Sequence, residues 1–152
     1  MFRISRRLDY GLQLMIALAA EPENRSQATA VLAEKLQIPL PFLHQIGRSL
    51  IQGRLIKATP GPHGGLRLNM PADEILLLQI VETLEGPVCI APGPDGETGP
   101  RTEACNTSEV WLGLQTQLVE HLNGIRLSDL SMTYAMEQAV EAVAFNQNGK
   151  NH

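Results

Sequence analysis

The segment QIPLPFLHQIGRSLIQG at 37–53 constrains the fold of this chain more than any other part of the sequence. Pro41 suits the first turn of a helix, and three apolar positions then fall on one side of that helix: Leu43, Ile46 and Leu50. The other side carries hydrogen-bonding side chains: His44, Gln45, Arg48 and Ser49. A short helix with one apolar and one donor-rich side is typical of the second helix of a helix-turn-helix.

The residues before this segment predict two more helices. Apolar residues recur at steps of three and four over 5–20, which is the pattern of a helix with one buried side. The polar stretch EPENRSQ interrupts that pattern, and Thr29 or Ser26 is expected to cap a short second helix that ends near Leu36. Together with the helix in 37–53, these two make a three-helix core.

The residues after this segment predict a β-hairpin and a buried helix. Residues 55–58 and 66–68 have the composition of short strands, and the turn-rich TPGPHGG between them favours a hairpin. Residues 75–84 are strongly apolar and are followed by Gly86, a natural helix stop, so a core helix is expected there. The predicted fold class of 1–86 is mainly α, a winged helix-turn-helix with the hairpin as its wing.

The rest of the chain divides into a loop, a long helix and a tail. Residues 87–105 are rich in Pro and Gly and have no periodicity, and loops of this length are usually either functional or disordered. Residues 106–131 are expected to form a long helix and a short one after it, and 132–152 a partly helical tail. The long helix carries one apolar stripe: Trp111, Leu114, Leu118, Leu122 and Ile125. A second copy of this small chain would cover the stripe, which predicts a homodimer.

The charge of the chain is divided unevenly along its length. Residues 1–70 hold nine Lys/Arg against four Asp/Glu, a net charge of +5, although the whole chain carries −4. The remainder holds three Lys/Arg against twelve Asp/Glu, a net charge of −9. A basic head with an acidic remainder is typical of a DNA-binding domain joined to a dimerising or sensing part.

Five blocks of the sequence, in this order, resemble the Rrf-two type family of winged helix-turn-helix transcriptional regulators, whose members include the iron–sulfur cluster repressor IscR, the nitric-oxide sensor NsrR and the cysteine-metabolism repressor CymR. The blocks are ISRRLDYGLQLMIALA, LAEKLQIPLPFLHQIGRSL, GPHGGLRL, IVETLEG and CNTSEVWLGLQTQLVEHLNGIRLSDL, and the resemblance covers about residues 2–131. It implies a winged head, a long carboxy-terminal helix that crosses over in the dimer, and a partly palindromic double-stranded DNA operator.

The residues expected to contact DNA lie in the helix-turn-helix and the wing. Gln45 can pair with adenine, and Arg48 can read guanine or hold a phosphate. The resemblance places the wing turn along the minor groove, but Pro60 stands where the family has an Arg. His44 stands where the cluster repressor has an acid. The predicted contacts are Thr29, Pro41, His44, Gln45, Arg48, Ser49, Lys57, His63, Gly64, Gly65 and Arg67.

Cys89 and Cys105 stand where the family has the first and last of its cluster-binding cysteines, and the middle cysteine is absent. Ser108 replaces a ligating His of the cluster repressor, and Asp9 matches the position from which the nitric-oxide sensor supplies an Asp across the dimer. Two thiolates alone cannot complete an iron–sulfur site, although family members with mixed ligands exist. Three alternatives stay open: a cluster held by Cys89, Cys105 and Asp9, of the 2Fe–2S rather than the 4Fe–4S type; a cluster-free member that responds to a metabolite; and reversible oxidation of the two thiols.

The leading hypothesis is a homodimeric, sequence-specific DNA-binding regulator, expected to be a repressor, that senses its signal through the Cys89–Cys105 loop. An enzyme with one of these thiols as nucleophile and His63 or His121 as base is disfavoured, because the two His lie in the presumed wing and dimer helix. The basic head disfavours a protein-interaction adaptor that has lost DNA binding. No apolar run reaches the roughly 18 residues of a membrane helix and no signal-type stretch is seen, so the protein is expected in the cytoplasm.

Overall fold

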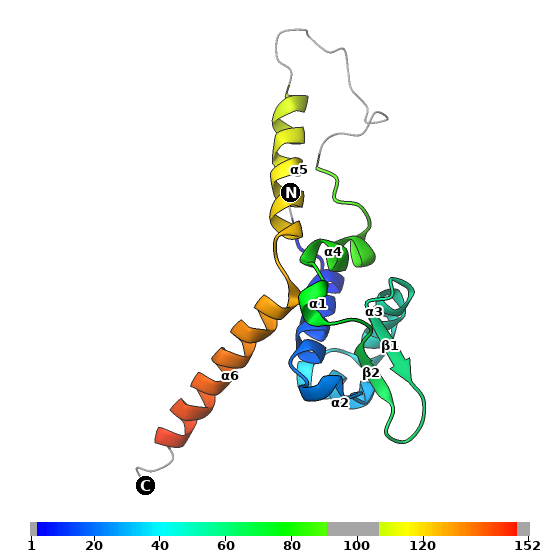
Figure 1. Ribbon diagram of the computed structural model, residues 1–152, viewed down its shortest axis with the longest axis vertical. Coiled ribbons are helices and arrows are strands. Elements are labelled where there is room, and N and C mark those ends of the chain that lie inside the picture. Colours follow the sequence, from blue (N-terminus) through cyan, green and yellow to red (C-terminus); the bar gives the residue numbers. More distant parts are fainter. Residues whose placement is uncertain (1–2, 91–106, 149–152) are drawn as a thin grey trace.

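In the computed structural model, which describes residues 3–90 and 107–148, helices α1 to α4 and a two-stranded hairpin form a head from which α5 and α6 extend (Figure 1). Short 3₁₀ turns lie at Pro22–Asn24 and Ala72–Glu74. Among the described residues, no helix is both long and apolar enough to cross a membrane. The main elements are α1 Arg6–Ala19, α2 Thr29–Leu36, α3 Leu40–Gln52, β1 Ile56–Thr59, β2 Gly65–Leu68, α4 Leu77–Glu85, α5 Ser108–Asn123 and α6 Leu127–Asn148.

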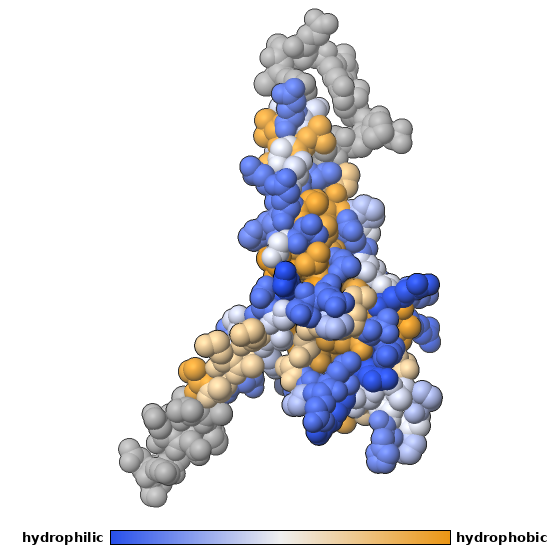
Figure 2. All heavy atoms as spheres, viewed as in Figure 1, coloured by the Kyte–Doolittle hydropathy of each residue, from blue (hydrophilic) through white to orange (hydrophobic). Residues whose placement is uncertain are grey.

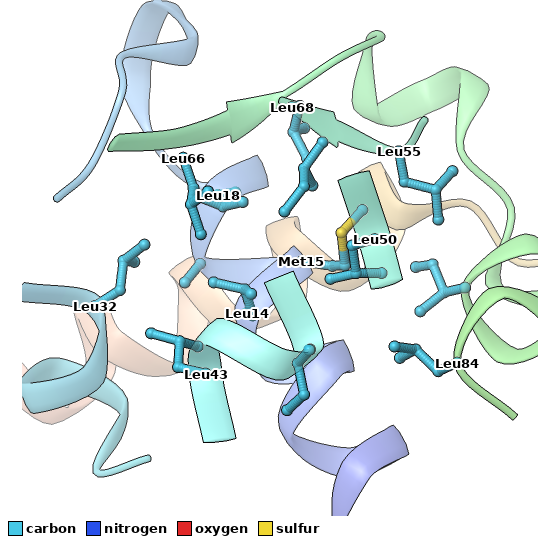
Figure 3. Close-up of a cluster of buried hydrophobic side chains, with 14 of the residues drawn as sticks. Leu14, Met15, Leu18, Leu32, Leu43, Leu50, Leu55, Leu66, Leu68 and Leu84 are labelled. Carbon is cyan, nitrogen blue, oxygen red and sulfur yellow. The ribbon is translucent and has the colours of Figure 1, made fainter. Parts of the chain in front are cut away.

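One hydrophobic core joins all the elements of the head (Figure 3). The apolar side predicted for α3 is confirmed, because Leu43, Ile46 and Leu50 are all 0% exposed. Helix α1 contributes Leu14 and Met15 to the same core, and both side chains are fully buried. No charged or polar residue of the described chain is buried in this core. The buried side of α3 is therefore packed by apolar side chains from several elements of the head.

The start of α2 differs from the prediction. Ala28 occupies the position before the helix and no side chain caps it, so the predicted capping by Ser26 or Thr29 is wrong. The backbone just before α2 instead pairs with the wing: Gln27 N donates to Leu66 O at 2.9 Å, and Leu66 N donates to Gln27 O at 2.8 Å. This pairing holds the chain extended up to Ala28, so tertiary structure sets where the helix begins.

The hairpin is antiparallel, with Lys57 opposite Arg67 and Thr59 opposite Gly65. Its second strand is also tied to the turn after α1. The Asn24 side chain donates to Leu68 O at 3.0 Å and accepts from Leu68 N at 3.0 Å. The predicted wing is therefore present and is held against the head along one side.

Helix α4 begins two residues later than the predicted start at Ile75. Ile75 O accepts from Leu127 N at 2.8 Å, and Leu77 N donates to Ile125 O at 2.9 Å. These bonds make a small bridge between the entry to α4 and the junction of α5 with α6. Gly86 ends α4 with φ +84°, as its position predicted. The bridge fixes both carboxy-terminal helices to the head.

The two carboxy-terminal helices also depart from the predicted boundaries. Gly124 ends α5, so Ile125 lies beyond the helix and does not continue its apolar stripe. Helix α6 runs without a break from Leu127 to Asn148, so the division predicted between 131 and 132 has no counterpart in it. The predicted short helix and the predicted tail are one helix, because residues 132–148 contain no glycine or proline that would end it.

Candidate nucleic-acid interface

The outer side of α3 presents three exposed hydrogen-bonding side chains: His44, Gln45 and Arg48. Pro41 lies in the first turn, as predicted, and is also exposed. Because the opposite side of the helix is fully buried, these side chains are held in one orientation toward solvent. A rigid helix with donors on its open side is the element that enters a major groove.

Ser49 differs from its neighbours on α3 because α1 already engages it. Arg7 Nη2 donates to Ser49 Oγ at 2.6 Å, and Ser49 Oγ donates to Gln45 O at 3.4 Å. Arg7 was not among the predicted site residues. No local pattern could have indicated it, since 42 positions separate it from Ser49. A charged guanidinium therefore lies beside the recognition helix, and Ser49 has less capacity left for a base than the sequence suggested.

The wing brings its predicted residues to one edge of the head. His63 is exposed at the turn, and Lys57 and Arg67 are half-buried on opposite strands. A Cβ on Gly64 would overlap Thr59 O, and Gly65 has φ +150° with no room for a Cβ beside Gln27 O. Both glycines are thus required by the fold, and their contact with DNA stays a prediction.

The structure describes two of the three residues predicted for a metal site. Cys89 is exposed after α4, and Asp9 is exposed on α1, where it accepts from Gln13 Nε2 at 3.0 Å. Cys105 lies outside the described residues. No group of three or more His, Cys, Asp or Glu side chains able to hold a metal ion exists in the part of the chain described. The described residues of a single protomer therefore hold two of the predicted ligands, whereas a simple iron–sulfur cluster needs four.

The segment that carries Cys89 is attached to α5. Ile90 N, the next backbone amide, donates to Gln115 Oε1 at 2.8 Å. Cys89 thus lies between the end of α4 and a residue that is hydrogen-bonded to α5.

Helix α5 leaves apolar residues uncovered (Figure 2). Trp111 and Leu122 of the predicted stripe are half-buried, whereas Leu114 is 44% and Leu118 38% exposed. Val110 and Leu112, which were not predicted, are exposed as well. No residue of α5 is buried. An apolar helix surface of this kind is typical of a site that another protein surface covers.

Comparison with known proteins identifies the kind of protein that has this architecture. The model of a family described as "Rrf2: Iron-dependent Transcriptional regulator" matches residues 4–133. The HTH-type transcriptional regulator IscR of Cereibacter sphaeroides is 32% identical over 119 residues, which are 76% of this chain and 76% of that protein. A putative HTH-type transcriptional regulator of Synechocystis is 28% identical over 95% of this chain and 97% of its own length.

Solved structures of the same kind share the fold. CymR, the global cysteine regulator of B. subtilis, superimposes with a TM-score of 0.72 at 27% identity, over 88% of this chain and 98% of that structure. The structure of T. potens IscR gives a TM-score of 0.69 at 25% identity, over 91% of this chain and 90% of its own. The mainly helical, winged helix-turn-helix fold class predicted from the sequence is confirmed.

Proposed function

Because the chain belongs to the Rrf2 family of transcriptional regulators, we propose that it acts as a homodimeric repressor that reads a partly palindromic operator through α3 and the wing. Like its relatives, which are transcriptional regulators, the protein is a DNA-binding regulator and not an enzyme. The observation that carries the finer proposal is the exposed, donor-rich side of α3, which lies within residues 1–70, the part of the chain with a net charge of +5.

The dimer is proposed from the apolar surface of α5. Leu114, Leu118 and Val110 follow one another at steps of four, so they lie along one side of the helix, and all three are exposed. Pairing this side with its copy about a two-fold axis would bury it and set the distance between the two α3 helices. Two-fold symmetry in the protein corresponds to a partly palindromic operator.

The sensing part is proposed to be the loop 87–105, which contains Cys89 near its start and Cys105 at its end. Supporting this, Ile90 next to Cys89 is hydrogen-bonded to α5, the helix proposed to set the spacing of the heads. A signal that favours one dimer geometry by 1–3 kcal/mol changes operator affinity by roughly 5- to 150-fold. The signal is proposed to be a small effector or oxidation of the thiols by a peroxide, which takes up two electrons and two protons as a disulfide forms.

The DNA-binding proposal is tested by gel shift on promoter fragments at increasing salt concentration. Binding is expected to weaken steeply with salt, because phosphate contacts release counterions. Arg48→Ala is expected to lower operator affinity by about 5- to 150-fold, since one base or phosphate contact of an arginine contributes about 1–3 kcal/mol. The control is Arg126→Ala, an equal loss of charge at an exposed residue between α5 and α6. Absence of salt-sensitive binding to any fragment would contradict the proposed function.

The iron content of anaerobically purified protein decides between a cluster and the other signals. We expect colourless protein with well under one iron per protomer that still binds DNA, because the chain supplies two thiolates where a cluster needs four ligands. The measurement is an iron count together with a visible absorption spectrum. Stoichiometric iron with cluster absorption that is lost in Cys89→Ser would show instead that the dimer completes the ligand set.

A further inference from the structure

Gly47 lies in the middle of α3, where the fold does not require a glycine. Glycine in a helix interior costs about 0.5–1 kcal/mol relative to alanine. Gly47 has ordinary helical backbone angles, and a Cβ there would meet only Leu66 Cδ1, at 3.7 Å, which is ordinary van der Waals contact. This differs from Gly65, which has a positive φ and no space for a side chain. Neither backbone conformation nor packing accounts for Gly47.

Gly47 is one of the residues that line a groove of about 270 Å³ at the helix-turn-helix. Its apolar lining comes from Leu43, Ile51 and Leu66, of which Ile51 is 38% exposed and the other two are buried. Its polar lining comes from Thr29 and from His44 and Arg48, which are both exposed on the side of α3 proposed to face DNA. Any longer side chain at 47 would occupy this space.

We propose that Gly47 keeps the groove open for the C5 methyl group of an operator thymine, which makes Gly47 a specificity-determining position. The proposal rests on the DNA-binding function proposed above. Thymine is the base that presents an apolar group in the major groove, and the exposed apolar side chain of Ile51 beside Gly47 gives that group a contact. The cationic residue Arg48 attracts the phosphate backbone and brings the base edges over the groove.

The experiment removes the methyl group without changing base pairing. A duplex selected by the wild-type protein from a randomised pool is resynthesised with deoxyuridine in place of each thymine in turn. Wild-type protein is expected to lose about fourfold in affinity at one thymine per half-site, since a buried methyl group contributes about 0.8 kcal/mol. The remaining thymines serve as internal controls.

The matched variants change the groove. Gly47→Leu narrows it, so this variant is expected to bind more weakly and to bind the thymine and deoxyuridine duplexes equally at that position. Gly47→Ala is expected to melt no lower than the wild type, because alanine favours helix and its Cβ would be in ordinary contact with Leu66. Thermal melting of Gly47→Leu measures separately whether its loss of binding comes from unfolding.

Two results would overturn the inference alone: salt-sensitive binding with no thymine sensitive to loss of its methyl group, or a Gly47→Leu variant that still distinguishes thymine from deoxyuridine. The first would indicate that the groove receives sugar or phosphate. If the wild-type protein selects no duplex at all, the proposed function and this inference both fail.

Discussion

Replacing Leu114 and Leu118 together by glutamate is expected to convert the protein into a monomer whose head keeps its fold. Both side chains are more than a third exposed in the single chain, so charging them costs the monomer little. In the proposed dimer the two-fold axis repeats each change, and four leucines are lost at about 1.5–3 kcal/mol each. The dissociation constant of the dimer is therefore expected to rise by more than about 1000-fold.

Sedimentation measures whether the double variant has the mass of a monomer or a dimer. Gel shift on the selected operator measures its affinity for DNA. Operator affinity is expected to fall with the dimer, because each head then binds without the other. Thr116→Glu is the control, since Thr116 is an exposed residue of α5 outside the apolar stripe. A double variant that remains dimeric would exclude this side of α5 as the interface.

Leu50→Ala is expected to lower the free energy of unfolding by about 2–5 kcal/mol, a large part of the 5–15 kcal/mol typical of a domain. Leu50 is 0% exposed and packs in the core below α3. Shortening its side chain removes apolar contacts and leaves a cavity that a close-packed core fills only in part. Urea unfolding followed by circular dichroism gives the value.

The adjacent residue provides the matched control. Ile51 is 38% exposed on the same helix, so Ile51→Ala is expected to cost less than about 1.5 kcal/mol. Equal costs for the two variants would contradict the orientation of α3, because the helix could not then have one buried and one open side.

The elements that sequence reasoning located best are those with strong local patterns. Residues at steps of three and four predicted α1 and the buried side of α3, and the turn-rich TPGPHGG predicted the hairpin. Each of these signals lies within one element. A helix must place its apolar residues on one side to bury them, whatever it packs against. The donor-rich side of α3 is predictable for the same reason.

The starts of α2 and α4 could not be predicted in this way. Residues from elsewhere in the chain set both boundaries: Leu66 of the wing pairs with Gln27, and Leu127 pairs with Ile75. These hydrogen bonds join positions far apart in sequence, so no local propensity encodes them. The end of α5 differs, because Gly124, which ends the helix, is a local stop signal, and Leu77 then uses the backbone of Ile125 beyond it.

The proposed DNA-binding surface is also determined partly by local sequence patterns and partly by contacts between distant residues. The helical period of 3.6 residues puts His44, Gln45 and Arg48 on the open side of α3. The composition gives residues 1–70 a net charge of +5. Both are properties of the sequence itself. Only the packed structure decides that Ser49 is held by Arg7 and that Gly47 lines a groove, because both depend on which distant elements meet α3. Those contacts arise from tertiary packing.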